Sequence, residues 1–333
     1  MKLHKNLINK IKNAKTTCII TEISGNHIGN KRLFLNLIKS AYKNGADMVK
    51  IQTYEPKDIT LNSKSTFFKI KKGIWKNKYL WDLYKKAHTP YSWHHDAFEV
   101  AKRNKKILFS SPFSIRAVDL LEDLDCKLYK IASFEITDLN LINYIASKKK
   151  PIIISTGMAQ LNEIKDTYKF AKKSGIKNIS ILYCVSNYPS QLSDFNMNNL
   201  KILKETFDCT IGFSDHSTDN DVVKAAIMMG ATIVEKHISI DKKTGIDSKF
   251  SLIAKDFKNF REEIDKAFNL KGKNYFYRKK SELKNKRYRR SIFASKDIKR
   301  GDKFTEDNIK IIRPANGLNP KYYYDLIKQK STK

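Results

Sequence analysis

The chain has 333 residues, of which 41% are hydrophobic, enough to build a packed core, and this excludes an intrinsically disordered chain. Its 12 Gly and 7 Pro exclude collagen-like sequence, and no apolar run reaches the roughly 20 residues that span a bilayer. The net charge of +31 comes from 65 Lys and Arg against 34 Asp and Glu, with 55 Lys but only 10 Arg. Because Arg is the residue suited to bidentate phosphate and guanine contacts, this charge favours an anionic small substrate over nucleic-acid binding.

The N-terminal 20 residues are basic but lack a long apolar stretch with a cleavage site, so we expect a soluble cytoplasmic protein. The four cysteines show neither CxxC spacing nor clustering. A zinc ribbon or a disulfide framework is therefore not expected, and we interpret the three cysteines that lie in or beside apolar runs as buried, reduced thiols.

Eight short β-type runs alternate with amphipathic helical segments. The runs cover residues 17–24, 48–54, 107–113, 128–134, 151–158, 179–186, 210–216 and 232–239. This alternation predicts the α/β class and a (β/α)8 TIM barrel. A doubly wound open sheet is the competing architecture, but no GxGxxG motif follows the first run.

Polar side chains follow nearly all eight predicted strands, at the ends where a TIM barrel carries its active site. They are Glu22, Asn26, His27, Lys50, Gln52, Ser110, Ser111, Lys130, Ser133, Glu135, Ser155, Thr156, Ser186, Tyr188, Ser214, His216, Glu235 and His237. One such group would be ordinary helix capping, but this many predict a converging site. Lys130 and Ser133 fall on opposite faces of a strand, so the fourth strand should end or bend between them.

His216 and His237 end neighbouring strands and can therefore approach one point. Two neutral imidazoles suit a divalent cation such as Mn, Co, Zn or Fe, which can polarise a carbonyl as a Lewis acid. The alternative is that each is a satisfied core or capping histidine.

Lys50 and Lys130 lie inside the predicted barrel, where an ammonium group needs anionic partners. Glu22 and Glu135 could supply them. Alternatively, both lysines bind a doubly anionic ligand, helped by serine hydroxyls. A Schiff base on a desolvated lysine is a rival chemistry, against which the histidine pair argues.

Three segments outside the barrel repeat differ from it in amino-acid composition. Residues 55–89 form a long insertion rich in aromatics, which we interpret as a lid or substrate wall, with a satellite hydrophobic patch as the alternative. Residues 271–290 hold ten Lys and Arg and one acidic residue, as an exposed linker would. Residues 291–333 predict a small β-rich domain with a turn at 299–302 and a helix start at Thr305, which leaves 1–270 for the barrel.

The ordered motifs TEISGNH, GADMVKIQTY, LFSSPF, YKIASFEITD, ISTGMA, IGFSDHS, GATIVEKHIS and IRPANGL resemble the sialic acid synthase family over nearly the whole chain. Within it, LWDLYKKAHTPYSWH and KIASFEITD are similar to the pseudaminic acid synthase branch. N-acetylneuraminate and legionaminate synthases of the same family are the alternatives. A catalytically inactive basic barrel that binds nucleic acid or an acidic membrane is the alternative of another class.

The resemblance implies a transferase that condenses phosphoenolpyruvate with an open-chain amino sugar, which for this branch is 2,4-diacetamido-2,4,6-trideoxy-L-altrose. It implies a divalent metal, Mn2+ first and Mg2+ or Co2+ next, on His216 and His237. It assigns phosphoenolpyruvate to Lys50, Ser111, Lys130, Ser133, Ser155 and Ser214, the sugar to Gln52, Tyr188, Asp247, Tyr288 and Arg313, and catalysis to Glu22, Glu135 and His237.

The resemblance also implies that the C-terminal domain is an antifreeze-like SAF domain of the β-clip type that covers the partner's sugar site across a homodimer. Two departures from the family are evident. The sequence stops at IKQKSTK, where the family continues, so we expect an incomplete SAF domain. Ser186 replaces an amide of the neuraminate branch. We expect no specific nucleic acid and no membrane as partner.

Overall fold

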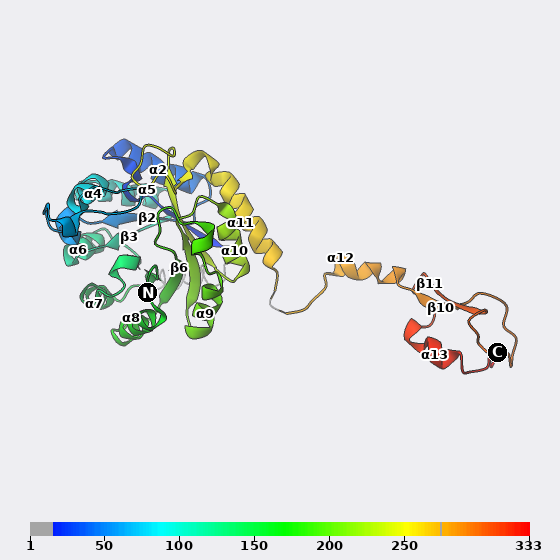
Figure 1. The fold of residues 1–333 in the computed structure, drawn as a ribbon. Coiled ribbons are helices and arrows are strands. Elements are labelled where there is room, and N and C mark those ends of the chain that lie inside the picture. Colours follow the sequence, from blue (N-terminus) through cyan, green and yellow to red (C-terminus); the bar gives the residue numbers. More distant parts are fainter. Residues whose placement is uncertain (1–15, 274) are drawn as a thin grey trace. The chain divides into compact units, whose positions relative to one another are not determined.

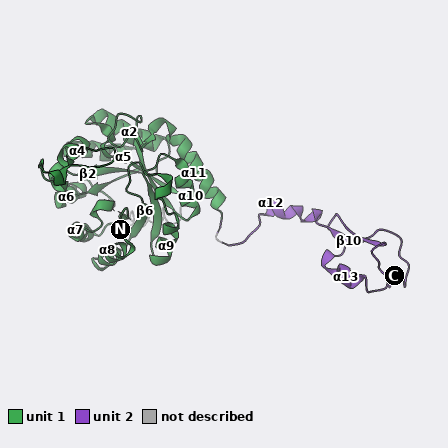
Figure 2. Cartoon of the chain, viewed as in Figure 1, with its two compact units in different colours: residues 1–272 green, residues 273–333 purple. Residues whose placement is uncertain are grey.

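The computed structural model describes residues 16–273 and 275–333, so most of the basic N-terminal segment lies outside the described residues. The chain divides into two compact units, residues 1–272 and residues 273–333 (Figure 2). In the described part, no helix is both long enough and apolar enough to cross a membrane.

The first unit is a closed barrel of parallel strands. In chain order these are β1 (Cys18–Glu22), β2 (Met48–Thr53), β3 (Ile107–Pro112), β4 (Tyr129–Ile131), β5 (Ile152–Ser155), β6 (Ile179–Cys184), β7 (Thr210–Asp215) and β8 (Ile233–Ser239). Each strand pairs with the next, and β1 also pairs with β8, where Cys18 is opposite Ile233. The predicted barrel is confirmed and the open sheet is wrong. A short β9 (Leu252–Ile253) pairs in parallel with the end of β8, where Ile238 is opposite Leu252.

Helices surround the strands in the TIM-barrel arrangement (Figure 1). They are α2 (Lys31–Lys43), α5 (His94–Arg103), α6 (Ile115–Asp123), α7 (Leu139–Ser147), α8 (Leu161–Lys173), α9 (Asn198–Thr206), α10 (Asn220–Met228) and α11 (Phe257–Lys271). Their apolar residues recur at helical spacing and are buried, as Phe34, Leu37, Ile38 and Ala41 are in α2. The insertion after β2 carries two further short helices, α3 (Pro56–Ile59) and α4 (Leu80–Ala87).

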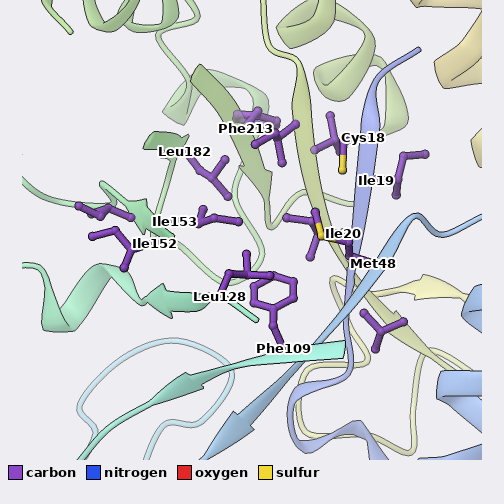
Figure 3. Packing of buried hydrophobic residues seen from close by; sticks show 14 of the residues in the cluster. Cys18, Ile19, Ile20, Met48, Phe109, Leu128, Ile152, Ile153, Leu182 and Phe213 are labelled. Carbon is purple, nitrogen blue, oxygen red and sulfur yellow. The ribbon is translucent and has the colours of Figure 1, made fainter. Parts of the chain in front are cut away.

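Apolar side chains fill the barrel below its C-terminal mouth. Ile20, Met48, Phe109 and Leu182 are at most 2% exposed and belong to one hydrophobic cluster, shown close up in Figure 3. Burying each such side chain stabilises the fold by about 1.5–3 kcal/mol. Alternation then puts Lys50 on the same strand face as Met48, one step nearer the mouth. The polar site therefore lies next to a layer of buried apolar side chains.

The second unit holds a two-stranded antiparallel sheet of β10 (Ser291–Ala294) and β11 (Ile309–Ile312). Before it lie α12 (Lys280–Leu283) and a 3-10 helix at Lys284–Tyr288, and α13 (Tyr323–Leu326) follows it. The predicted turn is present, because Asp302 N donates to Lys299 O at 3.0 Å. The helix start at Thr305 is wrong. Residues 305–309 form a single turn, closed by Ile309 N on Thr305 O at 3.1 Å, and the chain then enters β11.

Candidate active site

Two carboxylates and a lysine form a buried ion-pair cluster at the barrel mouth. Lys50 Nζ lies 2.5 Å from Glu22 Oε2 and 3.6 Å from Glu235 Oε1, and each of these residues is at most 4% exposed. Burial raises the pKa of Glu22, whereas Lys50 acts in the opposite direction. Burial alone would lower the pKa of Lys50, but the two carboxylates outweigh it and raise the pKa. Lys50 therefore stays cationic.

Lys130 is the second buried lysine of the site. Its Nζ donates to Ser155 Oγ at 2.5 Å and to the carbonyl of Ile131 at 3.2 Å. Burial lowers the pKa of Lys130, with only part of that effect offset by Glu235. Burial would raise the pKa of Glu235, but Lys130 and Lys50 outweigh it and lower the pKa. Glu235 thus acts electrostatically on both lysines.

Serine hydroxyls and a backbone amide also lie at the barrel mouth. Ser214 Oγ donates to Glu235 Oε1 at 3.0 Å, and Gly157 N donates to Ser133 Oγ at 3.1 Å. The strand β4 ends at Ile131 and a 3-10 helix begins at Ser133, which confirms the predicted break after Lys130. Ser111 Oγ is buried without a hydrogen-bond partner. An unpartnered buried hydroxyl is costly, so it is available for a ligand.

His216 and His237 come together as expected, with ring centroids 5.3 Å apart. His216 Nδ1 lies 2.9 Å from the carbonyl of Val185, and because a carbonyl only accepts, Nδ1 carries the proton and Nε2 the lone pair. Burial lowers the pKa of both rings, which keeps them neutral. His237 Nδ1 is buried without a hydrogen-bond partner, 3.6 Å from Asp247 Oδ2. These two imidazoles fit a divalent cation.

The loop after β8 reaches the site through Asn26. The amide Nδ2 of Asn26 donates to Ile238 O and to Ser251 Oγ, both at 2.8 Å, and its Oδ1 accepts from Asp247 N at 3.0 Å. A Cβ at Gly245 would lie 2.2 Å from that Oδ1, so the loop approaches Asn26 very closely. Asn26 therefore fixes Asp247, whose pKa burial raises to about 6.

Aromatic rings cover one side of the histidine pair. Tyr188 packs against His216 with ring centroids 4.6 Å apart, and Phe250 lies 5.0 Å from His237. Trp75, from the insertion after β2, packs on Tyr188 at 5.5 Å and donates through Nε1 to Ile246 O at 3.3 Å. The insertion thus contributes Trp75 to the aromatic cluster beside the histidine pair, and its role as a lid or substrate wall stays a prediction.

Glu135 is partly buried, and its Oε2 is buried without a hydrogen-bond partner. Burial raises the pKa of Glu135 to about 7, with Lys130 opposing the shift. A carboxyl group with such a pKa can both hold and release a proton near neutral pH.

Comparison with known proteins identifies the family. The NeuB family model matches residues 37–275, and the SAF domain model matches residues 289–328. A pseudaminic acid synthase of Campylobacter jejuni is 41% identical over 320 residues, which cover 96% of this chain and 93% of that relative. The chain belongs to the NeuB family.

Two further proteins are similar to this chain at lower identity. An N,N'-diacetyllegionaminic acid synthase of Campylobacter jejuni is 35% identical over 96% of this chain and 97% of that relative. The crystal structure of an N-acetylneuraminic acid synthetase from Leptospira borgpetersenii, in complex with citrate, is 26% identical with a TM-score of 0.73, and the match covers 81% of this chain and 90% of that chain.

The predicted site residues of this NeuB family member fall in both units. Tyr288 and Arg313 belong to the second unit, where Arg313 is exposed and Tyr288 stacks with Arg287 at 4.6 Å, so their role stays a prediction. Sequence reasoning missed the ion-pair role of Glu235, although its position on the inward face with His237 was a signal. It also missed Phe250, which lies in a loop without a periodic pattern.

Proposed function

We propose that the chain is a pseudaminic acid synthase. It would condense phosphoenolpyruvate with 2,4-diacetamido-2,4,6-trideoxy-L-altrose and water to give pseudaminate and phosphate. The observation that carries this proposal is the 41% identity to a pseudaminic acid synthase over 96% of the chain. The intact cation and histidine groups at the barrel mouth support it, because a barrel that had lost catalysis would not need to retain buried charges at a cost in desolvation.

Phosphoenolpyruvate would bind the two lysines. Lys50 and Lys130 lie buried near Glu235 and Glu22. Burial raises the pKa of Glu22 to about 7, which reduces the negative charge beside the lysines near neutral pH and leaves them able to bind an anionic ligand. The free hydroxyl of Ser111 and those of Ser133, Ser155 and Ser214 would complete its hydrogen bonds. Held in this way, the methylene carbon of the enol phosphate is fixed toward the sugar aldehyde.

A divalent cation, with Mn2+ preferred over Mg2+ or Co2+, would be held by His216 and His237, together with water and substrate oxygens. In the described residues, no group of three or more His, Cys, Asp or Glu side chains forms a metal-binding arrangement, so the two imidazoles are the protein's contribution. When bound, the cation supplies Lewis-acid polarisation of the sugar aldehyde.

The remaining residues orient the sugar and move protons. Gln52, Tyr188 and Asp247 would contact the sugar. Glu22, buried beside Lys50, would be a catalytic residue at the aldehyde end of the sugar. Glu135 would transfer a proton or orient the water that adds to C2 of the former enol phosphate before phosphate leaves. Its pKa of about 7 supports this role.

The second unit and the assembly extend the proposal. We infer a cytoplasmic homodimer in which Tyr288, at the end of the basic linker 271–290, and Arg313, in the SAF domain 291–333, reach the sugar site of the other copy. The match of the SAF domain model to residues 289–328 supports the nature of this module.

The deciding experiment measures phosphate release from phosphoenolpyruvate with Mn2+ and a panel of acetamido sugars, with EDTA controls and mass analysis of the product. We expect EDTA-sensitive release only with the diacetamido-trideoxy altrose. Release with N-acetylmannosamine or with the legionaminate precursor would instead assign another branch of the family. No release with any sugar would contradict the proposed activity.

A further inference from the structure

A second buried ion pair lies next to the site, between β7 and β8. Lys236 Nζ forms a salt bridge with Asp215 Oδ2, and the two side chains are 2% and 0% exposed. The two residues are direct neighbours in the β-ladder, where Asp215 is opposite Lys236 and Ser214 is opposite Glu235. Ser214 and Glu235 face the barrel interior, so alternation turns Asp215 and Lys236 to the outer face, away from the substrate.

The contacts of this pair involve the residues on either side of His216, Asp215 and Ser217. Lys236 Nζ also donates to the carbonyl of Ser217 at 2.7 Å, and Ser217 N donates to Asp215 Oδ1 at 2.9 Å. One ammonium group thus holds the residue before His216 and the residue after it. The same ammonium belongs to the residue that precedes His237. The backbone positions that carry both imidazoles are therefore tied together through one buried group.

Burying two charges is expensive, and an apolar pair of similar volume would often be as stable. The pair therefore needs a reason other than the stability of the fold. The contacts of Asp215 and Lys236 lie at the ends of the two strands that precede or carry His216 and His237. Among the described residues, these are the only two histidines whose ring centroids lie within 6 Å of each other. In metal centres, residues that do not contact the metal commonly orient the side chains that do.

We propose that Asp215 and Lys236 form a clamp that sets the separation of His216 and His237 for binding a divalent cation. The inference rests on the metal site of the proposed function. Both clamp residues are positioning residues, because they contact the backbone that carries the ligands and not the reacting atoms.

The test measures Mn2+ affinity directly, by titration calorimetry of the purified full-length protein without substrates, beside the midpoint of thermal unfolding of the metal-free protein. Lys236→Met leaves Asp215 buried and unpaired, so it can fail to fold. The main variant is therefore Asp215→Asn with Lys236→Met, which removes both charges together. Lys236→Arg keeps the charge and the donors. Lys150→Met is the matched control, because Lys150 pairs with Glu122 at the start of β5, the opposite end of the barrel.

We expect the double variant to bind Mn2+ at least tenfold more weakly than the wild type while its unfolding midpoint stays near the wild-type value. Lys236→Arg should recover most of the affinity, and Lys150→Met should lower the midpoint without changing the affinity. If the double variant binds Mn2+ as tightly as the wild type, the clamp is wrong and the metal site is retained. If the wild type itself binds no Mn2+, the metal site of the proposed function fails and the clamp fails with it.

Discussion

At the scale of single residues, burial sets the protonation states that the chemistry needs. Both site histidines are held neutral by burial, which lowers their pKa, and Lys50 is held cationic by Glu22 and Glu235. Glu135 differs from these groups, because no partner compensates its buried Oε2. Ionisation of Glu135 therefore lowers the free energy of unfolding.

Glu135→Gln should therefore change the pH dependence of the free energy of unfolding. Burial raises the pKa of Glu135 from 4.5 to about 7, so the native state binds the proton more tightly than the unfolded state. The stabilising contribution is then complete below about pH 4.5 and is lost as the pH rises through about 7. We expect the variant to be more stable than the wild type above pH 7, by about 1–3 kcal/mol, and to lose turnover.

Thermal unfolding of both proteins between pH 4 and pH 8.5 measures the difference, with Glu205→Gln as the control on a side chain that is 65% exposed. Parallel stability curves for the wild type and Glu135→Gln would show that Glu135 does not carry the raised pKa.

At the scale of elements, the site depends on how loops are attached to the barrel. The loop after β8 has no helix or strand between Ser239 and Leu252, yet it carries Asp247 and Phe250 to the histidine pair. Its attachment is the side chain of Asn26, which follows β1. A contact between β1 and the loop after β8 is possible because the barrel closes between these two strands.

Asn26→Ala should therefore weaken sugar binding selectively. We expect the KM for the sugar to rise at least tenfold, the KM for phosphoenolpyruvate to change little, and stability to fall by about 2–3 kcal/mol for the three lost hydrogen bonds. Gly245→Ala, which crowds Asn26 Oδ1 from the other side, should act in the same direction. Steady-state kinetics with each substrate varied in turn measure this split.

Asn30→Ala is the control in the same segment. Asn30 caps α2 by accepting from Leu33 N at 3.0 Å, so its loss should cost about 1 kcal/mol of stability and leave both KM values unchanged. An equal rise of both KM values in Asn26→Ala would contradict the specific role of the loop.

At the scale of the whole molecule, the chain joins two units with separate cores. The main hydrophobic cluster includes residues from Cys18 to Phe268, all in the first unit, whereas Ile292 and Ile309 are buried in the second. A barrel whose core is complete within its own unit should fold without the other unit.

A chain that ends at Gly272 should consequently unfold cooperatively, with a midpoint within about 3 °C of the barrel transition of the full chain, which corresponds to about 1 kcal/mol. It should keep its affinity for phosphoenolpyruvate and lose affinity for the sugar, if Tyr288 and Arg313 act there. Calorimetry and steady-state kinetics test the two parts separately. Aggregation of the barrel would contradict its independence, and an unchanged KM for the sugar would contradict a covering role of the second unit.

The sequence by itself determined the eight strands, the barrel and the convergence of polar side chains at its mouth. It could do so because each parallel strand is a short buried run with a polar residue at its end, and this pattern is local. It also determined that His216 and His237 meet, since they end consecutive strands of one sheet. The break after Lys130 followed from the alternation of side chains alone.

Only the tertiary structure decided which groups pair within that mouth. Glu22 was expected beside a lysine and is there, but the second carboxylate on Lys50 is Glu235 and not Glu135. The attachment of Asp247 to Asn26 joins residues 221 positions apart. Such contacts depend on barrel closure and on side-chain directions across strands that are distant in the chain. A local pattern in the sequence carries no information about either, and so it places residues at the mouth without assigning their partners.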